Sequence, residues 1–177
     1  QRLLQGDAAQ PAPYRVAANI PYYITSALIR RLLETHPAPQ RVVLTVQREV
    51  AERICAAPGD MSLLALSVQV FGRPQIAGRI PAGAFYPPPK VDSAIIRIDL
   101  YPQPIAPADR LDDFFRLAKA GFSQKRKTLR NALSGGMRWN AAETGQHLQA
   151  AGIDPQRRAE TLALDEWLAL VQAVRPD

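Results

Sequence analysis

The first half of the chain alternates short apolar runs with stretches in which apolar residues recur at helical spacing. Residues 14–18 and 41–46 are apolar runs of the kind found in buried strands. Residues 27–33 and 47–57, which follow them, carry apolar side chains three and four positions apart, as on one face of a helix. This alternation predicts an open α/β sheet, a fold in which ligands bind at the carboxyl ends of the strands.

A second pair of strands is predicted further along. Residues 62–71 have an ambiguous pattern that we interpret as a helix, and residues 75–80 have the pattern of a strand. Residues 93–101 alternate cleanly, with apolar side chains facing one way and Arg97 and Asp99 the other. We expect this segment to be the last strand and to form a hairpin with the strand before it.

Prolines mark a boundary in the middle of the chain. Residues 102–107 contain three prolines, and every later stretch has helical periodicity. We expect one of these helices at residues 124–133, ended by Gly135 and Gly136. The chain therefore divides into an α/β part and an all-helical part.

The charge of the chain is concentrated in the helical part. The 177 residues include 22 Lys and Arg against 16 Asp and Glu, a formal net charge of +6. Seven basic residues and no acidic one lie from Arg116 to Arg138, and such a local excess favours nucleic acid over simple solubility. For Lys90, a lysine in a solvent-exposed loop with no phosphate contact is the alternative interpretation. The candidates for phosphate contact are Lys90, Arg116, Lys119, Lys125, Arg126, Lys127 and Arg130.

Other classes of protein are disfavoured. The single cysteine, Cys55, excludes an internal disulfide, and we expect it to be an inert core thiol. The two histidines lie far apart with no Cys or acidic cluster at ligand spacing, so no metal site is predicted. No apolar run approaches the length of a membrane span. We expect a cytoplasmic monomer that does not bind membranes.

Candidate chemistry centres on Asn19-Ile20-Pro21-Tyr22, which directly follows the first predicted strand. Pro21 fixes its own φ and holds the residue before it extended, so the loop is stiff. The asparagine amide, the carbonyls of Ile20 and Pro21 and the tyrosine ring then offer hydrogen-bond acceptors beside a flat face. Such a set suits the exocyclic amine of a flat heterocycle, for example N6 of adenine. An Asx-type turn with a buried tyrosine explains the same four residues equally well.

The chain resembles the KsgA-type rRNA adenine-N6 dimethyltransferases over nearly its whole length. The family motif N-[LI]-P-Y matches residues 19–22, and further matches follow in the same order at residues 47–54, 85–94, 122–131 and 152–160. The resemblance implies an α/β fold, with an incomplete Rossmann-like S-adenosylmethionine methyltransferase domain over residues 1–102. It implies a small all-α domain over residues 103–177 that helps to dock the enzyme on the small ribosomal subunit.

The resemblance also implies roles for single residues. The residues that orient and hold the target base are Asn19, Ile20, Pro21, Tyr22 and Phe85. The tyrosine and Phe85 stack on the two faces of an adenine that has left its helix. Asp7 and Asn19 help to place S-adenosylmethionine. Without the resemblance, Asp7 is better explained as a loop aspartate and Phe85 as a core aromatic.

One family feature is missing from the sequence. A Rossmann-like methyltransferase has a glycine-rich turn after its first strand, where the backbone approaches the cofactor. None of the ten glycines forms a G-x-G after a strand. We expect the chain to be the later part of a longer protein, without the first two strand–helix units, and to be inactive alone.

For the whole enzyme, the resemblance implies dimethylation of two adjacent adenosines near the 3′ end of small-subunit rRNA, within the immature small ribosomal subunit. One alternative is the related large-subunit rRNA adenine-N6 methyltransferase that confers antibiotic resistance. The Phe-x-x-Lys-Arg-Lys and Gly-Ile-Asp-Pro segments favour the KsgA type. Another alternative is a ribosome-assembly or RNA-binding factor without catalysis.

Overall fold

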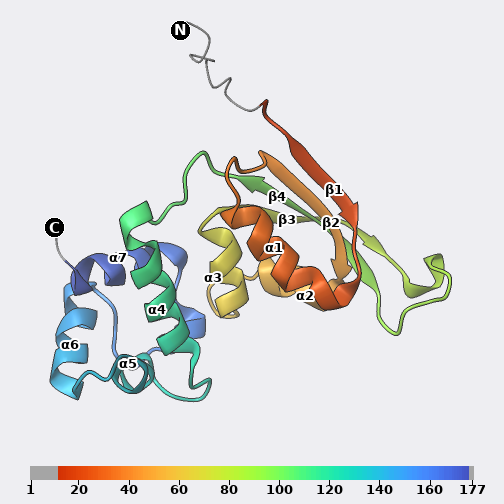
Figure 1. Ribbon diagram of the computed structural model, residues 1–177. Coiled ribbons are helices and arrows are strands. Elements are labelled where there is room, and N and C mark those ends of the chain that lie inside the picture. The colour runs from red at the N-terminus through yellow and green to blue at the C-terminus, as the bar shows by residue number, and fades with distance from the viewer. Residues whose placement is uncertain (1–11, 176–177) are drawn as a thin grey trace, which may run out of the picture.

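Four strands form a single sheet in the computed structural model, which describes residues 12–175 (Figure 1). The strands are β1 Arg15–Asn19, β2 Arg41–Gln47, β3 Gly72–Ile80 and β4 Ser93–Leu100. Their order across the sheet is β1-β2-β4-β3. β1 runs parallel to β2, and β4 is antiparallel to both of its neighbours. The predicted hairpin of the last two strands is therefore confirmed.

The register of the strands brings four chain segments to one edge of the sheet. Asn19 at the end of β1 lies opposite Thr45, and Gln47 at the end of β2 lies opposite Ser93. Ser93 at the start of β4 also lies opposite Ile80, the last residue of β3. The loops that follow β1 and β3 therefore leave the sheet at this one end of the strands, where β1, β2 and β3 finish and β4 begins. We call this end of the sheet the carboxyl edge.

Three helices cover one face of the sheet. They are α1 Thr25–Glu34, α2 Arg48–Ile54 and α3 Leu63–Gln69, and Figure 1 shows them in front of the strands. Burial alternates along β2 and β4 because successive side chains point to opposite faces. Leu44 and Ile96 are fully buried beneath the helices. The opposite face is half-exposed and carries Asp99, whose carboxylate binds Arg41 at 2.5 Å and Arg97 at 2.6 Å.

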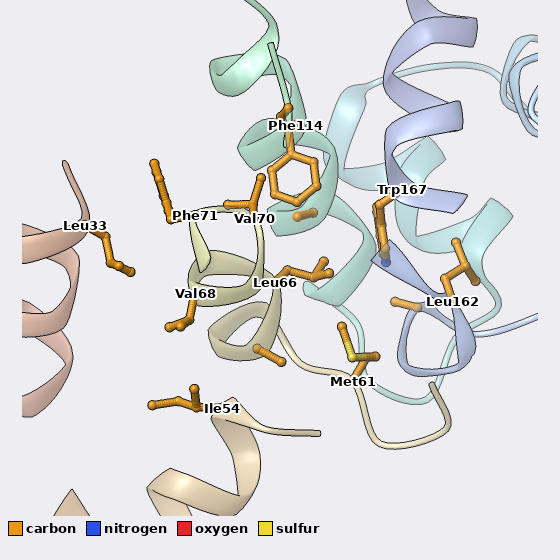
Figure 2. Close-up of a cluster of buried hydrophobic side chains, with 14 of the residues drawn as sticks. Leu33, Ile54, Met61, Leu66, Val68, Val70, Phe71, Phe114, Leu162 and Trp167 are labelled. Carbon is orange, nitrogen blue, oxygen red and sulfur yellow. The ribbon is translucent and has the colours of Figure 1, made fainter. Parts of the chain in front are cut away.

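The helical part packs against α3 through a shared core. Its helices are α4 Leu111–Phe122, α5 Leu129–Met137, α6 Ala141–Ala150 and α7 Leu164–Val174. Figure 2 shows Met61 and Leu66 beside Leu162 and Trp167 in one cluster of buried side chains. Phe71, two residues after α3, stacks on Phe115 of α4 with ring centroids 6.2 Å apart. One continuous core therefore holds the sheet and the helices together, and the domain boundary at residues 102–103 stays a prediction.

The helix expected at residues 124–133 was wrong at both ends. α5 begins after Thr128, whose side chain accepts a hydrogen bond from the Asn131 N–H, and it continues to Met137. Gly135 and Gly136 lie inside the helix, which ends where Arg138 adopts the left-handed conformation, with φ of 60°. α5 passes close to α4 at Gly136, where a Cβ would lie 2.6 Å from the Ala120 Cβ, so only glycine fits there without a shift of the helices.

One ion pair ties the last helix to the loop that precedes it. The Arg157 guanidinium donates to both carboxylate oxygens of Glu166 and to the Thr161 carbonyl. The Ala163 N–H donates to the same carboxylate at 2.8 Å. Chiefly through the hydrogen bond from Arg157, this environment lowers the pKa of Glu166. A lowered pKa in the folded state means that ionisation of Glu166 stabilises the fold.

We expect Glu166→Gln to lower the free energy of unfolding by about 1 kcal/mol at pH 7, a modest figure because both side chains are partly exposed to water. The pair's contribution is fully present above the ordinary glutamate pKa of about 4.3 and is lost as the pH falls through the lowered folded-state pKa. Urea denaturation at pH 7 and pH 3 should therefore show a difference that shrinks with acid. Glu34→Gln, which breaks the exposed Arg30–Glu34 pair, should show little difference at either pH. A Glu166→Gln deficit that persists undiminished at pH 3 would contradict this account.

Candidate active site at the carboxyl edge of the sheet

The Asn19–Tyr22 loop is held rigidly at the carboxyl edge. Asn19 is the last residue of β1, and its side chain is exposed. Ile20 is buried in the core, and Pro21 has extended backbone angles, with φ of −60° and ψ of 136°. Tyr22 then begins a single 3₁₀ turn, Tyr22–Ile24, that runs directly into α1. The buried isoleucine and the proline together fix the direction in which the loop leaves the sheet.

The Asn19 amide is available for a ligand. Within residues 12–175 its side chain has no hydrogen-bond partner, although an Asx-type turn requires a bond from the side chain to the nearby backbone. The Pro21 carbonyl accepts a hydrogen bond from the Ile24 N–H at 3.2 Å. A carbonyl oxygen has two lone pairs, so Pro21 retains one for a ligand. This geometry favours the ligand-binding interpretation of the loop over the turn.

Tyr22 connects this loop to the start of strand β4. Its hydroxyl lies 2.6 Å from the Ser93 hydroxyl, and the two residues are 71 positions apart in the sequence. Ser93 is fully buried at the start of β4. Tyr22 as a whole is half-buried, although its hydroxyl contacts the fully buried Ser93. The bond fixes the ring between the loop after β1 and the beginning of β4.

The second loop, residues 81–92, carries Phe85 and leaves the sheet at the same edge. Figure 1 shows it projecting beyond the end of β1. The Asp92 carboxylate accepts a hydrogen bond from the Ala82 N–H at 3.1 Å and so closes the base of this loop. The Arg48 N–H donates to the Asp92 carbonyl at 3.0 Å, and the two side chains form an ion pair at 3.4 Å. Phe85 is half-buried, unlike a residue of the central core.

Three residues that no sequence pattern singled out hold the two loops in place. Ser93, Asp92 and Arg48 make the bonds that join the loop after β1, the start of α2 and the loop before β4. Asp92 and Ser93 lie inside the matched segment at residues 85–94, which was the available signal. The bonds themselves connect distant positions, and no local pattern in the sequence indicates them.

The basic residues lie elsewhere. Lys125, Arg126 and Lys127 are exposed in the turn between α4 and α5, and not on a helix as expected. Figure 1 shows this turn and the loop before β4 on opposite sides of the molecule. The structure therefore does not bring these basic residues together with Asn19 and Phe85.

The other candidate cations differ in exposure to solvent and in their interaction partners. Arg116 and Lys119 are exposed on α4, where Arg116 pairs with Asp113 at 2.8 Å. Both line a groove between α1, α3 and α4 that contains none of the candidate catalytic residues. Arg130 on α5 is half-buried, and its Nε is enclosed without a partner among the described residues. Lys90 is exposed in the loop that carries Phe85.

Four further expectations concern the rest of the chain. Asp7, the second cofactor residue, lies outside the described residues. Burial raises the pKa of the half-buried Cys55 thiol, as in an unreactive cysteine. Over residues 12–175 there is no group of three or more His, Cys, Asp or Glu placed to hold a metal ion. In the same part of the chain, no helix combines the length and apolar character that crossing a membrane requires.

Sequence comparison identifies relatives that carry a functional name. The "Ribosomal RNA small subunit methyltransferase A" of Dehalococcoides mccartyi is 50% identical over 161 residues, which cover 91% of this chain and 55% of that protein. The protein of the same name from Syntrophotalea carbinolica is 45% identical over 167 residues, covering 93% of this chain and 62% of that protein. The chain thus spans little more than half the length of the curated relatives that it matches.

Solved structures agree on the fold. A dimethyladenosine transferase from Plasmodium falciparum matches with a TM-score of 0.76 and 28% identity, over 89% of this chain and 66% of that one. The 23S rRNA methyltransferase ErmE matches with a TM-score of 0.68 and 23% identity, over 94% of this chain and 68% of that one, which supports the shared fold alone. The sequence model of the family described as "Ribosomal RNA adenine dimethylase" matches residues 4–175. The chain belongs to the ribosomal RNA adenine dimethylase family.

Proposed function

We propose that this chain is part of an enzyme that methylates small-subunit rRNA. The enzyme transfers methyl groups from S-adenosylmethionine to N6 of two adjacent adenosines near the 3′ end of that RNA, two methyl groups to each. The observation that carries the proposal is that the Asn19–Tyr22 loop and the Phe85 loop leave the sheet at the same carboxyl edge, with Tyr22 bonded to Ser93 directly after the Phe85 loop. The names of the relatives, which are small-subunit methyltransferases, support the choice of substrate.

The chemistry depends on positioning N6. The amine of adenine is a poor nucleophile because its lone pair is delocalised into the ring. The Asn19 side-chain oxygen and the carbonyls of Ile20 and Pro21 accept its two hydrogens and favour a pyramidal nitrogen. Its lone pair then points at the methyl carbon. Tyr22 and Phe85 hold the two faces of the ring, a contact worth roughly 1–3 kcal/mol per base.

S-adenosylmethionine, when bound, supplies a methyl group attached to a positively charged sulfonium sulfur. That sulfur leaves readily as a neutral thioether. The bound cofactor would give its methyl group to the N6 lone pair, the electron pair of the broken C–S bond would stay on sulfur, and the N6 proton would pass to water, while Asn19 and the carbonyls of Ile20 and Pro21 would hold N6 in place. Positioning therefore carries most of the catalysis. Asn19 fits this task because its exposed amide lies at the end of the edge strand β1, and Asp7 is proposed as the second cofactor residue.

The basic residues bind RNA phosphates at a distance from the reacting atoms. The turn that contains Lys125, Arg126 and Lys127 exposes three adjacent cations, and Arg116, Lys119 and Arg130 lie on the helices beside it. Such contacts neutralise phosphates and give affinity without reading the base sequence. Lys90 lies in the Phe85 loop and is proposed to meet a phosphate near the target base.

The test uses a chain of the relatives' full length that contains residues 1–177, incubated with labelled S-adenosylmethionine and a small-subunit rRNA fragment. Digestion and mass spectrometry should find N6,N6-dimethyladenosine at two adjacent positions. The 177-residue chain alone should give none, since no glycine-rich cofactor turn is found in its sequence. Label on a large-subunit fragment instead would favour the antibiotic-resistance methyltransferase. RNA binding by the full-length chain with no methyl transfer would favour a non-catalytic assembly factor.

A further inference from the structure

Two tyrosines at the carboxyl edge are far more exposed than the other large apolar side chains of the described residues. Tyr86 is fully exposed and Tyr23 is 89% exposed, whereas Val91, the next in rank, is 45% exposed. Each tyrosine directly follows one of the two residues proposed to hold the target base, Tyr22 and Phe85. Isolated exposed aromatics are ordinary, but two of them beside one site call for an explanation.

The backbone explains why both rings point outward. Consecutive residues of a 3₁₀ turn point about 120° apart, so Tyr23 turns to solvent when the Tyr22 hydroxyl is held by Ser93. Phe85 has an extended backbone, with φ of −111° and ψ of 153°. In extended chain, neighbouring side chains lie on opposite sides, so the half-buried Phe85 sends Tyr86 into solvent. Each loop thus presents one half-buried and one free aromatic ring.

The charges around these rings favour a nucleic acid. Lys90 is exposed in the same loop as Tyr86, without an ion pair among residues 12–175. Arg79, near the end of β3, is 71% exposed, and its guanidinium lies 4.0 Å from Glu52. The nearby acidic side chains are already paired, Asp92 with Arg48 and Glu52 with both Arg48 and Arg79, so they leave Lys90 unneutralised. Exposed aromatic rings beside exposed cations are the usual surface for single-stranded RNA, whose bases stack while its phosphates contact the cations.

We propose that Tyr23 and Tyr86 are stacking surfaces for the two nucleotides that flank the target adenosine in the RNA strand. The inference rests on the proposed function. A base that leaves its stack removes a stacking partner from each neighbour, and an exposed ring next to the base pocket replaces that partner on either side. Tyr23, beside Tyr22, takes the neighbour on one side, and Tyr86, beside Phe85, takes the neighbour on the other. Both act as positioning residues that keep the strand in register with Asn19.

The test measures binding of the 177-residue chain to a ten-nucleotide single-stranded RNA with two central adenosines and 2-aminopurine beside them. Tyr23→Ala and Tyr86→Ala should each weaken binding about tenfold, and the double variant about a hundredfold, with less quenching of the 2-aminopurine. Phe variants should keep the affinity, and Leu variants should lose it. Tyr14→Ala is the matched control, because this exposed tyrosine precedes β1 at the opposite edge.

Affinity within twofold of wild type in the double variant, or Leu variants that bind as well as Phe variants, would overturn the inference. Methyl transfer by a full-length chain that survives unchanged in the double variant would overturn it too and leave the proposed function standing. RNA binding that depends on the aromatic rings of Tyr23 and Tyr86, in a full-length protein that methylates no RNA, would support the stacking role and contradict the proposed function.

Discussion

Replacing Asn19 with alanine should slow methyl transfer by a factor of about 100 to 1,000 while RNA affinity stays within about twofold. The expected size is that of removing one fixed hydrogen-bonding group that acts on the reacting atoms. The side chain is exposed and has no partner among residues 12–175, so its loss removes no contact that holds the fold. Stacking by Tyr22 and Phe85 and the basic turn would continue to bind the RNA. Single-turnover rates and fluorescence anisotropy of a full-length chain measure the two quantities separately.

The matched control is Asn131→Ala, which truncates an exposed asparagine on α5. It should leave the rate of methyl transfer unchanged, because α5 lies far from the carboxyl edge (Figure 1). Asn19→Ala should also leave the urea midpoint near that of wild type. Equal losses of rate and affinity in Asn19→Ala would assign the residue to RNA binding and contradict its role at N6.

Most of the sheet could be predicted from the sequence because burial leaves an apolar run in β2 and a period of two in β4. The alternation at residues 93–101 gave the correct faces of the last strand, and the apolar run at residues 41–46 gave the strand beside it. The position of Asn19 at a strand end follows from the same pattern. Local periodicity therefore sufficed to locate the loop on which the site is built.

The contacts that complete the site could not be predicted in this way. The Tyr22–Ser93 bond joins residues 71 positions apart, and it exists only because the register places the start of β4 at the same edge as the end of β1. The outward direction of Tyr23 and Tyr86 depends on backbone angles that a sequence pattern does not give. Tertiary geometry decides which of two adjacent aromatic residues turns inward.

The helix boundary at Gly135 and Gly136 was missed for a similar reason. Two glycines commonly follow a helix end, and local preference alone favours a stop there. In the structure a Cβ on Gly136 would lie 2.6 Å from the Ala120 Cβ and 2.7 Å from its Cα, so the missing side chain lets α5 approach α4 closely. The glycine serves packing between helices, and a rule about helix ends has no access to that contact.

The same contact predicts opposite effects for two adjacent substitutions. Gly136→Ala should lower the free energy of unfolding by about 2 kcal/mol, because the new methyl group meets the backbone of α4 and the helices must separate. Gly135→Ala adds the same methyl group one residue earlier. It meets only the end of the exposed Gln124 side chain, at 3.2 Å, which can move aside. Alanine then improves the helix itself, and this variant should be more stable by about 0.5 kcal/mol.

Urea denaturation of both variants tests the packing directly, since they share composition, helix and added volume. If the glycines were a simple helix stop, both alanines would extend the helix and change the stability alike. A loss confined to Gly136→Ala requires the close approach of α4 and α5, and Gly136→Ser should then be at least as unstable because it carries a Cβ of the same kind. Equal stability of the two alanine variants would mean that α4 and α5 are further apart in solution than the distances to Ala120 imply.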